Sequence, residues 1–403
     1  MSDEGAPGTI TVASRLEGYL RGGGLFIPLI TAFIAFLVGG LVVAATGANP
    51  IDTYRAIFEG SGLNWLFPWV SGDDRTLAAL NLQQTLILTA PLILTGLAVA
   101  FAFRAGLFNI GGQGQYLVGT FAAVYFGSKL DGTPALLHVV IAMLAGALAG
   151  ALWAGIAGLL KATAGVNEVI STIMLNWTAV YLGSYLFALS GPLHSGDPDS
   201  QSIPVSDDVL ESARLPVFWG DPELQGLHIG IFIALAVAVL FWVLLNRSVT
   251  GYEVRAVGLN PDAAEYAGIG AGRNYVKVML ICGLFAGLAG ALDVLGWQFR
   301  IATNDIQVSN IGYLGIAVAL LGRNTAFGTV AAALLFGALL NGTSVRNLDP
   351  AVFDPQLATN LTYIIQGLIV LFVSAPVLVT YLHPGRLRRR LRRRSRPAPA
   401  EGG

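Results

Sequence analysis

Long apolar runs are the feature that most restricts what this chain can fold into. Runs of about 20 apolar residues recur along it, and each is long enough to cross a bilayer as a helix. The chain is 54% hydrophobic and 12% charged, against roughly 25% charged residues in ordinary soluble proteins. Its 50 glycines suit membrane helices whose backbones approach closely. We therefore predict an all-α polytopic membrane protein.

The apolar runs predict about ten transmembrane helices. Their expected ranges are 25–47, 78–103, 106–127, 135–160, 170–190, 227–246, 276–298, 305–322, 325–343 and 360–382. The eighth is the weakest prediction, because its apolar run is short and follows polar residues. The corresponding division is a cytoplasmic segment at 1–24, a membrane domain at 25–382 and a basic cytoplasmic tail at 383–403.

The distribution of Lys and Arg predicts that both termini lie in the cytoplasm. With the N-terminus inside, most of the 23 Lys and Arg residues fall on the inner side, as the positive-inside rule requires. An even number of spans agrees with this orientation. The arginine run from Arg386 to Arg396 adds to the bias, and we expect it to contact anionic lipid headgroups rather than nucleic acid.

The sequence offers no enzyme active site. Its one cysteine, Cys282, lies within a predicted span, and its four histidines show no metal-ligand spacing. A P-loop needs a Gly-Lys pair to reach nucleotide phosphates, and the sequence contains no such dipeptide. We expect no cofactor or metal bound by this chain. If ATP drives the protein, another polypeptide binds it.

Two stretches carry polar side chains where a span should be apolar. They are FRAGLFNIGGQGQ from Phe103 and GVNEVISTIMLNW from Gly165. Unsatisfied polar groups in a membrane cost several kcal/mol, so these side chains need a role. We predict that they line a translocation path; the alternative is a hydrogen-bond network that ties helices together. The candidate pathway residues are Asn109, Gln113, Gln115, Asn176 and Trp177.

A third stretch, GYEVRAVGLNPDAAEYAGIG from Gly251, lies between two spans on the predicted inner side. It predicts a very short helix with both ends marked. Asn260 is a favoured N-cap, Pro261 fits the first turn and Gly268 suits the C-terminal stop. A helix of two turns is only marginally stable in isolation, so a function should account for it.

These stretches carry a family resemblance. FRAGLFNIGGQGQ, GVNEVISTIMLNW, GYEVRAVGLNPDAAEYAGI and GIAVALLGRN occur in this order. Together they resemble the permease subunits of bacterial ABC importers for simple sugars and nucleosides, the nucleoside branch in particular. The resemblance covers roughly residues 50–380, nearly the whole chain.

The resemblance implies a type II-like ABC importer permease fold of ten helices, with spans 2–5 and 7–10 as an inverted repeat. Identical tripeptides at 109–111 and 310–312 give that repeat slight support. It further implies nucleoside import across the bacterial cytoplasmic membrane. The implied partners are an ABC ATPase that binds ATP and Mg, a second permease subunit in a heterodimer, and an extracytoplasmic substrate-binding lipoprotein.

The resemblance also gives the short helix a role. Such permeases place there a coupling helix that docks into a cleft of the ATPase, and Ala263, Ala264 and Ala267 would present a narrow surface to that cleft. The alternative is an ordinary capped connector. The residues expected at the ATPase contact are Glu253, Arg255, Asn260, Pro261, Asp262, Ala264 and Glu265.

Other functions remain open at this point. The same machinery could import a simple sugar or a branched-chain amino acid. An ion-coupled secondary transporter is less favoured, because few intramembrane carboxylates are available for coupling, Asp293 being the clearest. The acidic segment 191–226 is expected to help seat the receptor outside, although acidic outer loops also follow from keeping basic residues inside.

Overall fold

The structure is a computed structural model that describes residues 26–45, 47, 49–221, 226–344, 360, 363–364, 367–368 and 371. The chain divides into two units, one of residues 1–50 and 363–403 and the other of residues 51–362. In the first unit, helix α2 (Phe26–Ala45) matches the first predicted span. The tenth predicted span, 360–382, lies almost entirely outside the described residues, as do the N-terminal segment and the arginine run.

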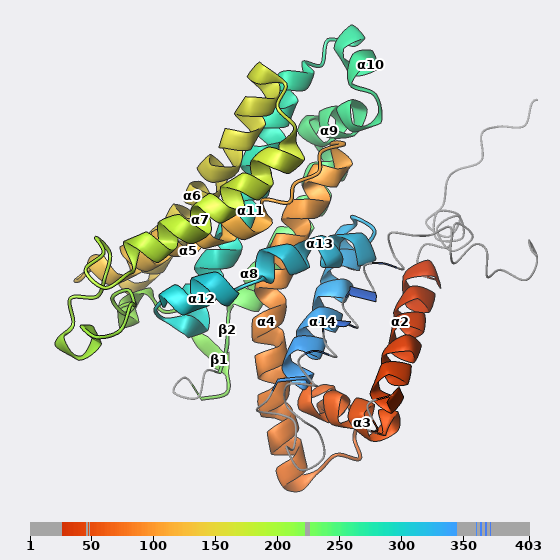
Figure 1. The fold of residues 1–403 in the computed structure, drawn as a ribbon, viewed down its shortest axis with the longest axis vertical. Helices are drawn as coiled ribbons and strands as arrows, with labels where there is room; N and C mark the ends of the chain where they lie inside the picture. Colours follow the sequence, from red (N-terminus) through yellow and green to blue (C-terminus); the bar gives the residue numbers. More distant parts are fainter. Residues whose placement is uncertain are drawn as a thin grey trace, which may run out of the picture. The chain divides into compact units, whose positions relative to one another are not determined.

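The second unit is built mainly of helices. In chain order they are α3 (Pro50–Gly60), α4 (Gly72–Arg104), α5 (Gly112–Lys129), α6 (Ala135–Ala164), α7 (Glu168–Leu186), α8 (Gly230–Arg247), α9 (Val249–Leu259), α10 (Pro261–Tyr266), α11 (Ala271–Asp293), α12 (Thr303–Val308), α13 (Ile311–Leu321) and α14 (Ala326–Gly342). Short 3-10 turns and two antiparallel strands, β1 (Val217–Trp219) and β2 (Leu227–His228), complete the described part. Helices α9 and α10 lie at one end of this unit and α3 and the start of α4 at the other, with β1 and β2 between them (Figure 1).

Five of the described helices are long and apolar enough to cross a membrane, or up to six if a bent helix pair counts as one span. The five are α4, α6, α7, α8 and α11 with its π-helical extension. Helix α5 is long enough, but it carries two glutamines in its first turn and Lys129 at its end. The described part of the chain is thus a helical, multi-pass membrane protein, and it does not test the full number of ten spans.

The predicted eighth span, 305–322, is not one helix in the structure. It is divided into α12 and α13 by Ser309 and Asn310. The Ser309 carbonyl accepts a hydrogen bond from the Gln113 side chain at 3.0 Å. Helix α13 has 11 residues, so it is about 16 Å long, roughly half the thickness of a hydrocarbon core. The polar lead-in that weakened this prediction is the place where the helix breaks.

The predicted third span also starts later than the sequence suggested. Helix α5 begins at Gly112 rather than at 106, because the Asn109 side chain accepts a hydrogen bond from the Gly111 amide at 2.9 Å. This local bond replaces the helical pattern over the preceding residues. The stretch from 107 to 111 is therefore irregular backbone, largely buried except at Phe108.

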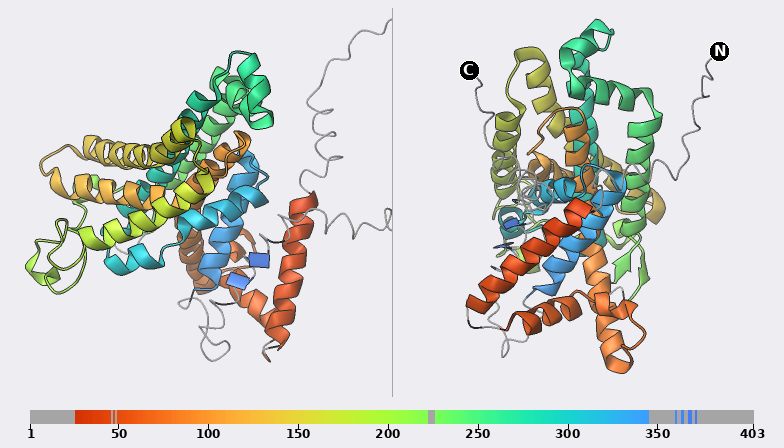
Figure 2. Two further views of the ribbon diagram at one scale, coloured as in Figure 1. Left: turned by 45° about the horizontal axis from the view of Figure 1, so that its top comes forward. Right: turned by 90° about the vertical axis from the view of Figure 1, so that its right-hand side faces the viewer.

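Helices α4 and α11 form the interior, and their apolar stretches are mostly buried. Helix α4 packs against α13 and α14, and α11 packs against α5 and α6; Figure 2 shows α13 and α14 beside α4. Glycines allow the closest approach between α6 and α11, because a Cβ on Gly283 would lie 2.2 Å from the carbonyl oxygen of Gly150. The glycine content of the sequence is thus used in tight helix contacts.

Candidate functional site

Four of the predicted pathway residues form one buried amide cluster at the start of α5. Asn109 and Gln115 bond to each other through both amide groups, at 3.2 and 3.0 Å. Gln113 accepts from the Gly312 amide at 2.9 Å and donates to Ser309. Asn176, from α7, accepts from the Gly114 amide at 2.8 Å and donates to the Ile110 carbonyl at 2.9 Å. Exposure of these four side chains is 1% or less.

The cluster therefore satisfies its own hydrogen-bonding groups in this conformation. Its bonds also join α5 to α7 and to the first turn of α13, which agrees with the network alternative considered for these residues. Trp177 is not part of it: this side chain is 53% exposed on α7 and stacks near Tyr181. The structure brings four of the five candidates together and leaves the fifth on the surface.

A cavity of about 380 Å³ lies close to this cluster, around the ends of α11 and α12. Its size falls in the range of about 300–1,000 Å³ that is usual for small-molecule sites. Charged, amide and aromatic groups all contribute to its wall. The lining residues are Leu88, Tyr116, Asp293, Trp297, Gln298, Arg300, Asp305, Val308, Ser309, Asn310 and Ile311.

The most unusual group in this cavity is the Asp293 carboxylate. Its side chain is 3% exposed and accepts hydrogen bonds from the Tyr116 hydroxyl and the Trp297 indole N–H. The Gln298 amide donates a third bond at 3.0 Å. The sequence identified Asp293 only as an intramembrane carboxylate, and it missed Tyr116 and Trp297. Trp297 lies one helical turn after Asp293, a spacing that could have indicated the pair.

At the other end of the unit, the predicted short helix is present as α10. The Asn260 side chain caps it by accepting from the Ala263 amide at 3.1 Å, and Pro261 occupies its first turn. Gly268 follows with φ of 82°, the left-handed conformation that ends many helices. Helices α9 and α10 form a bent pair, called here the α9–α10 elbow.

The structure corrects one residue of the predicted docking surface, whereas Ala263 and Ala267 are exposed. Ala264 is 4% exposed and packs in a small cluster with Val257 and Ala271, so it faces the protein rather than a partner. An Ala264→Arg substitution would therefore disrupt the elbow itself. The most exposed large side chains of the elbow are Tyr266 and Leu259, at 95% and 88% exposure. Sequence reasoning passed over both, although an aromatic residue in a short polar helix was a usable signal.

The other residues assigned to the ATPase contact divide into two groups. Glu253 pairs with Lys277 of α11 at 2.7 Å, and Arg255 is partly buried. These two residues therefore lie on the side of the elbow that packs on the protein. The second group is exposed on α10 and at its N-cap, where a partner can reach it: Asn260, Pro261, Asp262 and Glu265.

The elbow touches the chain segment that leads into the amide cluster. Gly258 lies so near that segment that a Cβ on it would be 2.4 Å from the carbonyl oxygen of Arg104. The Arg104 side chain in turn donates to the carbonyl of Asn324, between α13 and α14, at 2.9 Å. One short segment thus connects the elbow, the start of α5 and the end of α13.

Comparison with known proteins gives matches over most of the chain. Residues 81–374 match the family model described as branched-chain amino acid transport system / permease component. The guanosine ABC transporter permease protein NupP of Bacillus subtilis is 38% identical over 89% of this chain and 95% of its own length. The nucleoside ABC transporter permease protein NupB of Lactococcus lactis is 31% identical over 89% of this chain and 93% of its own.

A third relative is the glucose ABC transporter permease protein TsgB13 of Haloferax volcanii, 33% identical over 86% of both chains. No solved structure matches the chain. The family match covers the amide cluster, the cavity and the elbow, and the relatives align over nearly their full lengths. The chain therefore belongs to the permease component family of the branched-chain amino acid transport system type, the membrane-spanning part of ABC transporters.

Proposed function

We propose that this chain is the membrane-spanning permease subunit of an ATP-driven nucleoside importer. The observation that carries the proposal is the likeness to relatives named for guanosine and nucleoside transport, along 89% of the chain. The cavity adds support from the structure, because its amide, aromatic and carboxylate groups suit a neutral cargo with hydroxyls and a flat ring.

The machinery that this function requires includes three further proteins. An ABC ATPase would bind ATP and Mg and dock on the α9–α10 elbow, where Tyr266 offers an exposed aromatic anchor. A second permease subunit would complete the membrane pathway as a heterodimer, and Trp177 on the surface of α7 is available to such a contact. A receptor lipoprotein outside would deliver cargo to the opposite end of the unit.

A ten-helix fold with inverted halves is part of the proposal. Two packing relations support it: α4 packs on α13 and α14, whereas α11 packs on α5 and α6. The first helix of each half would thus pack against helices of the other half. The second of the repeated tripeptides also lies close to the chain just after the first, because a Cβ on Gly312 would lie 2.3 Å from the backbone of Gln113. With ten spans, both termini would lie in the cytoplasm, flanking a membrane domain over 25–382.

The amide cluster keeps its proposed place on the pathway, in a conformation other than the one described. Asn109, Gln113, Gln115 and Asn176 join α5, α7 and α13, so movement of these helices would expose amide groups to passing cargo. Weak and exchangeable amide contacts are what a translocation path requires, because a deep site would hold its cargo. Asn176→Leu should therefore lower uptake while the complex still assembles.

Import of a sugar is the second candidate, since a glucose permease is 33% identical to this chain. The cargoes that name these relatives share one chemical group, a ring that carries neighbouring hydroxyls. Uptake of labelled guanosine and labelled glucose in a strain that lacks this chain, with and without the gene restored, decides between them. Restored glucose uptake without nucleoside uptake would replace the proposal by the sugar function.

A further inference from the structure

The cavity contains a carboxylate that no positive charge balances. Among the described residues, no ion pair includes Asp293. Arg300 lines the same cavity but lies near Asp208 instead, at 4.0 Å. A buried carboxylate held only by neutral donors is costly in a membrane protein. Packing alone therefore does not explain why a carboxylate is present at this position.

The hydrogen-bond geometry leaves one acceptor position open. Oδ2 of Asp293 accepts from Tyr116 and Gln298, whereas Oδ1 accepts, among the described residues, only from Trp297. A carboxylate offers about four lone-pair directions, so Oδ1 can take one more donor. Asp293 lines the cavity, so a bound molecule with an O–H or N–H group can supply it.

The backbone that carries this group is irregular. After Asp293 the α-helix continues as one π-helical turn, Val294–Gln298, a feature often found at functional sites. Phe299 then adopts φ of 57°, a conformation that is unfavourable for a bulky side chain. The strained turn places Trp297 and Gln298 so that both donate hydrogen bonds to the Asp293 carboxylate. It therefore prearranges the donors around Asp293.

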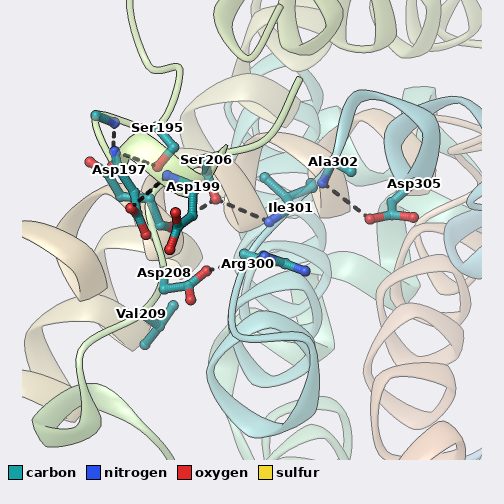
Figure 3. Close-up of polar contacts among 12 residues, drawn as sticks. Ser195, Asp197, Asp199, Ser206, Asp208, Val209, Arg300, Ile301, Ala302 and Asp305 are labelled. Carbon is teal, nitrogen blue, oxygen red and sulfur yellow. Dashed lines mark hydrogen bonds and ion pairs between the residues drawn. The ribbon is translucent and has the colours of Figure 1, made fainter. Parts of the chain in front are cut away.

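The segment 191–226, called here the outer segment because the proposed function places it outside, holds this strained turn in place. The Val209 amide donates to the Phe299 carbonyl at 2.7 Å, and the Arg214 guanidinium lies over the Phe299 ring at 4.5 Å. The next residues are bonded as well: the Ile301 amide donates to the Ser206 hydroxyl at 3.0 Å (Figure 3). The rim of the cavity is thus bound directly to the segment that faces the proposed receptor.

We infer that this cavity is a cargo subsite on the outer half of the pathway, with Asp293 as its specificity-determining acceptor. Oδ1 of Asp293 would accept a hydrogen bond from one of the neighbouring hydroxyls of the cargo ring, and the Trp297 ring would border its flat face. The inference rests on the proposed function as a nucleoside importer. It assigns the hydroxyl selection to the permease itself, in addition to any selection by the receptor.

The test uses the complete complex in proteoliposomes. The receptor is saturated with cargo, so that its affinity does not affect the transport rate. Initial rates are measured for guanosine and for 2′,3′-dideoxyguanosine, which lacks both hydroxyls. The wild type should prefer guanosine by about tenfold or more, the scale of a hydrogen bond to a charged group. Asp293→Asn should lose most of that preference, and Asp293→Glu should restore part of it.

Asp199→Asn is the matched control, because this aspartate of the outer segment is exposed, lies outside the cavity lining and, among the described residues, forms no ion pair with a cavity residue; it should behave as wild type. Equal rates for the two cargoes in the wild type would overturn the inference without any variant, and so would full preference in Asp293→Asn. Wild-type transport that needs external sodium, with the need lost in Asp293→Asn, would assign the site to an ion instead. Absence of any nucleoside transport by the wild type would overturn the proposed function itself.

Discussion

The outer segment and the α9–α10 elbow are both connections between spans, yet they are held in different ways. Residues 204–215 of the outer segment bond to the chain through their backbone, for example from Ser206 to Ile301 and from Leu215 to Leu295, both at 2.9 Å. The elbow depends on the Asn260 cap, a salt bridge from Glu253 and a small apolar cluster around Ala264.

The difference shows what each connection can transmit. Backbone bonds do not depend on side-chain identity, so the outer segment and the cavity rim form one unit that tolerates single substitutions. The elbow leaves two large side chains, Leu259 and Tyr266, almost fully exposed and contacts the rest of the chain at few places. It is therefore able to move with a partner, and it should be sensitive to single changes at those places.

The largest effect is expected for Gly258→Val. A Cβ at Gly258 would lie 2.4 Å from the backbone oxygen of Arg104, and forced overpacking of this kind costs about 1–3 kcal/mol or more. The elbow should separate from the segment before α5, and uptake should fall to background. Gly270→Ala is the control, because a Cβ there meets no atom within 4 Å. Normal uptake by Gly258→Val would show that this contact does not couple the elbow to the spans.

The next effect concerns the partner face of the elbow. Tyr266→Ala removes a side chain that is 95% exposed and should weaken ATPase binding by about 2 kcal/mol, as loss of an interface hot spot does. Copurification of the ATPase and uptake should fall together, while the melting temperature of the isolated permease stays the same. Tyr266→Phe keeps the ring and should retain binding. A Tyr266→Ala complex of normal affinity would remove α10 from the ATPase contact.

A smaller effect is expected on the outer side from Ser206→Ala. The substitution removes the bond from the Ile301 amide to the Ser206 hydroxyl, but the backbone bond from Ser206 to Ile301 remains. The attachment of the outer segment should weaken by about 1 kcal/mol. Limited proteolysis of the purified permease should therefore cut this segment somewhat faster than in the wild type. Release of the whole segment would mean that side chains, not the backbone, hold it.

The smallest effect is expected for the Lys129–Asp207 pair, at 2.7 Å and partly exposed. Burial raises the pKa of Asp207, but hydrogen bonds from Lys129 and the Gly196 amide outweigh it and hold the pKa below its ordinary value of 3.8. The stabilisation is therefore complete above pH 3.8 and is lost only as the pH falls through the lower folded value. This pair should therefore cause no change in the melting temperature between about pH 7 and pH 5.

Asp207→Asn should lower stability by about 1 kcal/mol or less, as for other partly exposed ion pairs. A loss of stability at mild acidity that disappears in Asp207→Asn would contradict the sign of the pKa shift. A loss that persists in the variant would have to come from another titrating group.

The limits of sequence reasoning are clearest at particular elements. The capping of α10 was predictable because its signals are local: Asn260, Pro261 and Gly268 act within a few residues of chain. At the eighth predicted span the polar lead-in was a local warning, but the contact of Ser309 with Gln113, 196 residues away along the chain, could not be predicted. The exposure of Ala264 was predicted wrongly, since the side of α10 that packs inward is set by α9 and α11.

The sequence alone determined that this is a helical membrane protein with a capped surface helix and polar groups inside its spans, because hydropathy and capping are properties of short stretches. Tertiary structure alone decided that Asp293 meets Tyr116, Trp297 and Gln298 beside a cavity. It also decided that four of the polar candidates are buried together at the start of α5 while Trp177 faces outward. Which groups satisfy a buried polar side chain depends on helices brought together from distant parts of the chain, and no local pattern contains that information.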